Sequence, residues 1–149
     1  MSRHSTYMSI AFACCALAAP ALAAGGELYE GDLDPAPFDA SNKPDVQGAG
    51  DLTAVLDGRS LTVTGNFSGL SAPATGAQVR MGLAMGVPGD SIGTLTAAHA
   101  ASGTISGMIM LNAKQLAALK SKSLYVRIDS EKAPDGSLMG WLLPVQANQ

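Results

Sequence analysis

Residues 124–143, LYVRIDSEKAPDGSLMGWLL, contain the pattern that decides the fold. Apolar and polar residues alternate, a Pro-Asp-Gly sequence interrupts them, and a second alternating run follows. Because the side chains of a β-strand point alternately to opposite faces, each run predicts a strand with one apolar face. The Pro-Asp-Gly sequence predicts the turn of a hairpin. Tyr125, Arg127 and Asp129 are expected on the face opposite the apolar one.

The same alternation recurs through the preceding sequence. Residues 51–57 and 61–67 alternate around an Asp-Gly dipeptide, which tolerates the positive φ angles of a tight turn, and they predict another hairpin. Asn112 is a suitable N-cap for a short helix over residues 113–119. Further strands are predicted at residues 27–33, 77–84, 92–96 and 103–111. Seven or eight strands with one short connector helix predict an all-β fold, either an antiparallel β-sandwich or a flattened Greek-key barrel.

The composition fits one domain plus a targeting segment. The chain has 149 residues, of which 47% are apolar and 14% are charged, and this is enough to build a core. Seventeen glycines and eight prolines favour short strands joined by turns over long helices. The net charge of −3 gives no basic face for nucleic acid, so no nucleic-acid partner is predicted.

Residues 1–23 predict a cleaved secretory signal peptide. Arg3 precedes an apolar run at residues 10–22, which ends in the small-x-small pattern read by a signal peptidase. The run is shorter than the roughly 20 apolar residues of a membrane span. We therefore expect cleavage after Ala23 or Ala24, a periplasmic or secreted protein, and no membrane span after cleavage. An uncleaved anchor is the alternative interpretation.

Both cysteines of the chain, Cys14 and Cys15, lie inside this run. The residues before Cys14 lack the aliphatic pattern of a lipoprotein signal, which disfavours a lipid anchor. After cleavage the chain would have no cysteine, eight basic residues and twelve acidic ones, for a net charge of −4. We therefore expect a disulfide-free protein held together by packing and hydrogen bonds.

The mature chain is predicted to have three parts. Residues 24–50 form an N-terminal strand and a Pro/Asp-rich loop, residues 51–144 form the β domain, and residues 145–149 form a disordered C-terminal tail. The loop is long for a compact domain, which suggests either a functional segment or a cover over one end of the sheet.

The inventory of reactive side chains argues against catalysis. Only His99 remains after signal cleavage, and a zinc or copper site needs several converging ligands. A glycine-rich phosphate loop is missing, and His99 would have to act as the base for any serine nucleophile. Calcium is a minor option, because Glu30, Asp32, Asp34 and Asp39 are spaced to supply oxygen ligands without matching an EF-hand. We predict no cofactor, no metal and no enzymatic activity.

Six stretches follow one another in a specific order and spacing. They are LDG at 56–58, FSGL at 67–70, AQVRMG at 77–82, GTISG at 103–107, LYVRIDS at 124–130 and APDGSLMG at 133–140. Over residues 52–143 this order resembles the chordin-type (CHRD) domain family of exported β proteins. Members of this family often carry His-x-His at the positions of Gln78 and Arg80, and another histidine at the position of Asp129.

The resemblance implies that these outward-facing histidines converge as metal ligands, and all three are replaced here. An ion pair between Arg80 and Asp129 is one hypothesis for the replacements, and two unrelated surface charges are the alternative.

The resemblance implies an exported non-catalytic CHRD-domain protein, a binding or structural module of the cell envelope. The predicted interaction surface is the polar face formed by Gln78, Arg80, Tyr125, Arg127 and Asp129. Trp141 lies either near this face or in the core. The sequence does not name a partner, and another exported protein is the class we expect. The alternative, by family analogy, is a metal-binding protein or metalloenzyme, which the replaced histidines disfavour.

Overall fold

The computed structural model describes residues 25–37 and 44–146, which form nine strands and one helix. The predicted signal peptide and parts of the predicted loop and tail lie outside these residues. The strands are β1 (Glu27–Pro35), β2 (Ala49–Asp57), β3 (Ser60–Ser68), β4 (Ala74–Met81), β5 (Asp90–Ala97), β6 (Gly103–Met110), β7 (Leu124–Ser130), β8 (Leu138–Trp141) and β9 (Leu143–Pro144). The helix is α1 (Ala113–Lys120).

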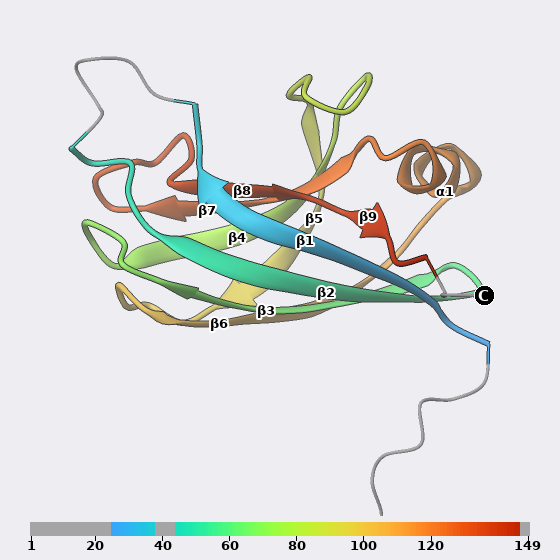
Figure 1. Cartoon of the computed structure of the whole chain (residues 1–149), viewed down its shortest axis with the longest axis horizontal. Coiled ribbons are helices and arrows are strands. Elements are labelled where there is room, and N and C mark those ends of the chain that lie inside the picture. The colour runs from blue at the N-terminus through green and yellow to red at the C-terminus, as the bar shows by residue number, and fades with distance from the viewer. Residues whose placement is uncertain (1–24, 38–43, 147–149) are drawn as a thin grey trace, which may run out of the picture.

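Eight strands form a closed antiparallel barrel in the order β1-β2-β3-β6-β5-β4-β7-β8 (Figure 1). Strand β1 closes the barrel, because it pairs with β2 and again with β8, while β9 adds to β1 as an extra strand. The order β3-β6-β5-β4 is that of a Greek key. The all-β prediction is therefore confirmed, and the structure selects the barrel from its two alternatives.

Strand alternation separates the core from the outer surface. In β7, Leu124, Val126 and Ile128 are fully buried inside the barrel, as the opening hairpin pattern predicts. Tyr29 and Leu33 of β1 point into the same core, so the segment before residue 51 is part of the barrel. The interior is filled by apolar side chains from every strand except β9.

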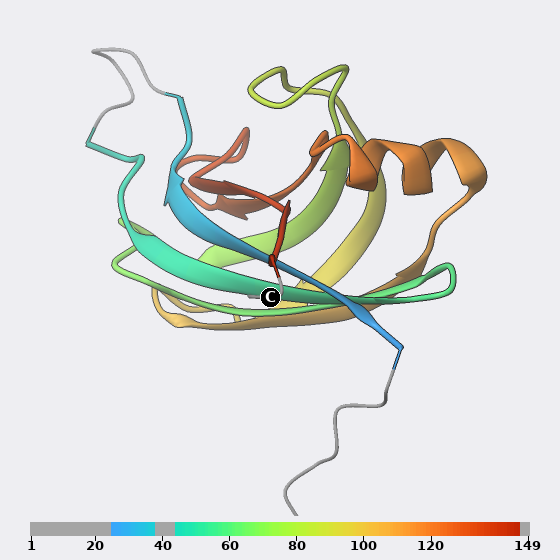
Figure 2. The same ribbon diagram turned by 45° about the vertical axis from the view of Figure 1, so that its right-hand side comes forward.

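Helix α1 covers one end of the barrel, between β6 and β7 (Figure 2). The predicted N-cap is confirmed: the Asn112 side chain accepts a hydrogen bond from Gln115 N, and Gln115 Oε1 accepts one from Asn112 N. This reciprocal pair is a capping box. Leu119 is fully buried and joins the helix to the barrel core. No helix among the described residues is long and apolar enough to cross a membrane.

Two leucine substitutions separate core burial from surface exposure. We expect Leu119→Ala to lower the free energy of unfolding by about 2–4 kcal/mol, because it leaves a cavity beneath α1. The same change at Leu83, which is almost fully exposed, should leave the stability unchanged. Urea denaturation of the two variants checks this, and similar stability losses at the two positions would contradict the placement of α1.

Candidate functional site

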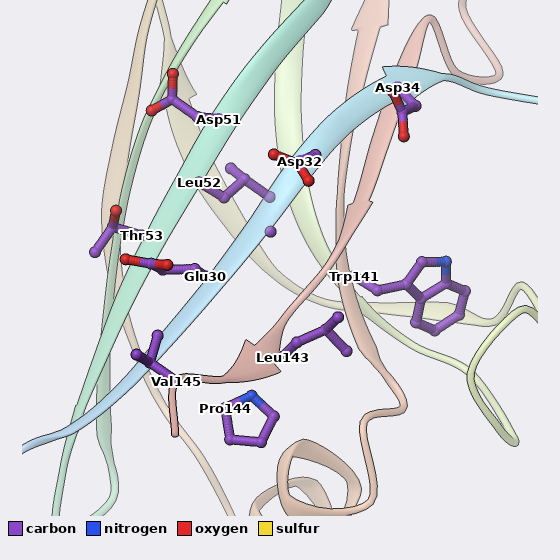
Figure 3. A pocket seen from close by; sticks show the side chains of 11 residues that line it. Glu30, Asp32, Asp34, Asp51, Leu52, Thr53, Trp141, Leu143, Pro144 and Val145 are labelled. Atoms are coloured by element: carbon purple, nitrogen blue, oxygen red, sulfur yellow. The ribbon is translucent and has the colours of Figure 1, made fainter. Parts of the chain in front are cut away.

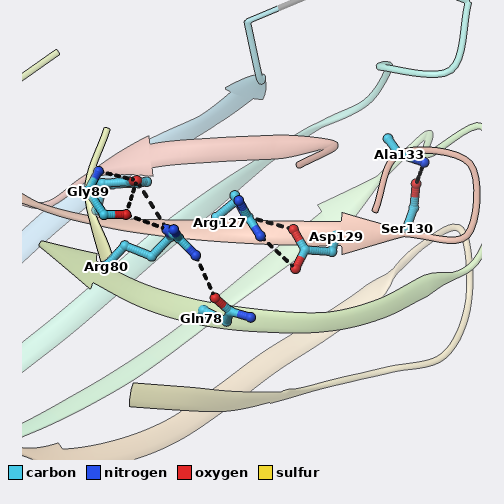
Figure 4. A network of polar contacts seen from close by, with 8 residues as sticks. Gln78, Arg80, Gly89, Arg127, Asp129, Ser130 and Ala133 are labelled. Carbon is cyan, nitrogen blue, oxygen red and sulfur yellow. Dashed lines mark hydrogen bonds and ion pairs between the residues drawn. The ribbon is translucent and has the colours of Figure 1, made fainter. Parts of the chain in front are cut away.

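The five residues of the predicted polar face lie together on the outside of β4 and β7 (Figure 4). In the pairing of these strands, Gln78 lies opposite Arg127 and Arg80 lies opposite Tyr125. Asp129 follows on the same face of β7, opposite Gly76. The strands thus bring the predicted residues together, and their contacts decide what the face can do.

Arg127 and Asp129 form an ion pair within β7. Arg127 Nε lies 2.7 Å from Asp129 Oδ1 without the alignment of a hydrogen bond, and Arg127 Nη2 donates to Asp129 Oδ2 at 3.2 Å. The side chains are only 20% and 12% exposed. Burial raises the pKa of the Asp129 carboxyl above its ordinary value of 3.8, although the hydrogen bond and charge of Arg127 act in the opposite direction.

Arg80 has other partners. Its Nε donates to Gly89 O at 2.9 Å and to Tyr125 Oη at 3.2 Å, and its Nη1 donates to Gln78 Oε1 at 2.8 Å. Among the described residues, Arg80 and Asp129 form no ion pair, contrary to that hypothesis. Strand pairing explains this, because it places Arg80 opposite Tyr125, whereas Arg127 lies two residues from Asp129 on the same face.

Tyr125 connects the polar face to the β4–β5 loop, which comprises residues 82–89. Its hydroxyl accepts a hydrogen bond from Gly89 N at 3.0 Å, and its side chain is buried. Trp141 of β8 packs against the Tyr125 ring, with 4.6 Å between the ring centroids and an angle of 41° between the planes. Trp141 therefore lies beside the polar face, outside the core cluster.

A groove of about 610 Å³ lies along β1, beside β2 and β9 (Figure 3). Its charged lining residues are all acidic: Glu30, Asp32, Asp34 and Asp51. The remaining lining residues are Gly31, Leu52, Thr53, Trp141, Leu143, Pro144 and Val145. Trp141 thus contributes to both the groove and the packing around Tyr125.

The strand geometry explains why these carboxylates gather. Glu30, Asp32 and Asp34 occupy alternate positions on the outer face of β1, while Tyr29 and Leu33 point inward. The pairing of β1 with β2 then places Asp51 directly opposite Asp32. Like charges in opposite cross-strand positions repel each other, so this arrangement favours a positive ligand.

The described carboxylates of the groove do not converge on one point. In residues 25–37 and 44–146, no three or more histidine, cysteine or acidic side chains come together to hold a metal ion. Asp39 of the calcium option lies outside the described residues. The sequence singled out Glu30, Asp32 and Asp34 but missed Asp51, whose place in the groove depends on strand register.

His99 lies elsewhere on the barrel and is exposed. Its Nδ1 lies 2.8 Å from Ala74 O, and its Nε2 lies 3.4 Å from Glu131 Oε1. No hydrogen bond or ion pair joins it to the five polar-face residues in the described structure.

The Arg127–Asp129 pair generates a pH-dependent prediction. We expect Arg127→Met to lower the free energy of unfolding by about 2 kcal/mol at neutral pH, because a largely buried carboxylate loses its charged partner. The pKa of Asp129, already raised in the folded protein, should rise further. The free-energy cost of the unpaired carboxylate is full above that pKa and disappears below the ordinary pKa of 3.8, where the carboxyl is protonated in both the folded and the unfolded state. The loss should therefore shrink as the pH falls toward 3.8.

Urea denaturation across this pH range measures the effect, with the Arg127→Met/Asp129→Asn double variant as the control. Because the double variant has no carboxylate at this position, its stability difference from the wild type should lack the pH dependence. A loss in Arg127→Met that is constant with pH would contradict the coupling.

The comparison with protein families agrees with this fold. The model of the CHRD domain matches residues 33–142, which run from the end of β1 through β8. No curated protein and no solved structure gives a significant match to the chain. Because the family match covers most of the sequence, the chain belongs to the CHRD-domain family.

Proposed function

We propose that this chain is an exported, non-catalytic CHRD-domain protein of the cell envelope that binds a basic segment of another exported protein. The observation that carries this proposal is the charge of the groove beside β1. Four of its eleven lining residues are carboxylates, and none is basic. The polar face around Arg80 and Arg127 is a weaker candidate, since both guanidinium groups already have partners.

The shape of the groove favours an extended ligand over a single ion. Its carboxylates follow alternate positions along β1 and do not converge on one point. Successive lysine or arginine side chains of a partner would relieve the repulsion between Asp32 and Asp51.

Export and the absence of catalysis are supported by the sequence. Residues 1–23 have the organisation of a secretory signal, and both cysteines lie within them. The polar face combines two arginines, a tyrosine and a carboxylate without histidine or cysteine, and these groups bond mainly to one another. Such contacts support a structural role for the face.

A charge-matched pair of variants tests the groove. Glu30→Gln/Asp32→Asn/Asp51→Asn should weaken binding of a lysine-rich peptide by about tenfold or more, because it removes three groove carboxylates. The control, Asp45→Asn/Asp57→Asn/Asp90→Asn, removes the same charge from positions outside the groove and should retain binding.

Fluorescence of Trp141, the only tryptophan, reports the titration directly. Pull-down from the periplasmic fraction with the two triple variants then identifies the natural partner. Equal binding by both would overturn the groove proposal. Stoichiometric zinc or copper in the purified protein would instead favour the metal-binding alternative of the family.

The export of the protein is tested by a separate experiment. Cell fractionation should place the protein in the periplasm or the medium, and N-terminal sequencing should begin at Ala24 or Gly25, because a signal peptidase cuts after a small-x-small sequence. A cytoplasmic protein that still begins with residues 1–23 would contradict the export proposal and leave the groove measurement unaffected.

A further inference from the structure

The β4–β5 loop exposes apolar side chains at its tip. Leu83 is 94% exposed, Met85 56% and Val87 42%, and Leu83 is the most exposed large apolar residue of the described chain. Figures 1 and 2 both show this yellow-green loop projecting from the barrel beside α1. Exposed apolar groups that cluster in this way mark interaction sites more often than single ones do.

The base of the loop is firmly held. Gly82 N donates to Ser123 O at 2.9 Å, and Gly89 is bonded by both Arg80 and Tyr125. Both glycines are required, because a Cβ at either would collide with backbone oxygen of Val87 or Met81. The polar face of β4 and β7 therefore acts as the support that projects the apolar tip into solvent.

Most charged residues in the middle of the sequence are basic, although the acidic Asp90 directly follows Gly89 at this base. Between residues 58 and 128 the sequence has six basic residues and one acidic residue, Asp90. The helix α1 and the turn after it contribute Lys114, Lys120 and Lys122. Lys120 Nζ lies 3.8 Å from Glu27 Oε1, which partly compensates its charge. Lys114 and Lys122 form no ion pair among the described residues.

Lys122 is in an unusual place for a lysine. It has a φ of 62° and is the only described residue other than glycine with a positive φ. Lys122 N bonds Leu119 O, and Ser123 N bonds Ala118 O, which is the Schellman motif that ends many helices. Glycine is strongly preferred at this position, so a lysine adopts it at a conformational cost. Despite this cost, the chain has a cationic side chain in the turn that contacts the base of the loop.

We propose that the β4–β5 loop docks this protein onto an anionic lipid surface. Leu83, Met85 and Val87 would enter the interface between headgroups and acyl chains, while Lys122 contacts anionic headgroups. A lipid surface fits better than a protein partner. A stable protein interface usually covers about 800 Å² on each side, whereas three side chains on a projecting tip need only a deformable apolar layer.

Vesicle co-sedimentation tests the proposal. The wild type should bind vesicles of equal parts phosphatidylglycerol and phosphatidylcholine, and Leu83→Ser/Met85→Ser should weaken this binding by about tenfold or more. Met108→Ser/Met110→Ser is the matched control, because it removes two exposed apolar side chains from β6 and should bind like the wild type. Any contribution from residues 10–22 is the same in every variant.

The Lys122→Gly variant distinguishes the effect of the lysine charge on vesicle binding from an effect on stability. It should raise the denaturation midpoint, because glycine adopts the positive φ without strain, and still weaken binding to the phosphatidylglycerol vesicles by roughly fivefold. Binding to pure phosphatidylcholine should not respond to this change. Lys132→Gln, at the opposite end of β7, removes the same charge and should have no effect on binding.

Three results would overturn the proposal. They are wild-type protein that does not bind the phosphatidylglycerol vesicles, Leu83→Ser/Met85→Ser that binds them as tightly as the wild type, and Lys132→Gln that weakens binding as much as Lys122→Gly does. Sedimentation velocity without vesicles tests whether the loop instead binds a second copy of the chain. If the wild type dimerises and Leu83→Ser/Met85→Ser does not, the loop docks a second copy of the chain and not a lipid surface.

Discussion

The hydrogen bonding of β1 to β2 on one side and to β8 on the other is the constraint on which this structure depends. It closes the sheet, so the eight strands of the barrel share one continuous apolar interior. Closure also removes the open edges at which sheets associate. The described residues contain no cysteine, and therefore strand pairing and core packing hold the fold without a disulfide.

The same strand creates the acidic groove. Because β1 contributes Tyr29 and Leu33 to the core, its intervening positions must face outward, and three of these carry carboxylates. Closure against β2 adds Asp51 opposite Asp32, and β9 supplies the apolar wall with Leu143. Stability and surface charge are thus coupled in one element, since the pairing that completes the barrel also brings like charges together.

On the outer face of β4 and β7, the charged side chains already bind one another or neighbouring polar groups. Arg127 forms an ion pair with Asp129, while Arg80 donates hydrogen bonds to Gln78, Gly89 and Tyr125. In the family pattern, the positions of Gln78, Arg80 and Asp129 often carry histidine. Here their contacts connect the barrel wall to the base of the β4–β5 loop, so the face supports a neighbouring surface element. The groove and this loop differ in character, the first acidic and the second apolar with lysines nearby.

Local sequence patterns were sufficient to predict most of the secondary structure. The alternation in residues 124–143 predicted the β7–β8 hairpin, and Asn112 predicted the start of α1, because a strand repeat of two residues and a helix cap are both local features. For the same reason, the sequence placed Gln78, Arg80, Tyr125, Arg127 and Asp129 on outward faces.

Only the tertiary structure decided between sandwich and barrel, paired Asp129 with Arg127, and brought Asp51 into the groove. Each of these depends on which strands become neighbours and in what register. Alternation specifies the face on which a side chain lies, but long-range strand pairing specifies what it meets there.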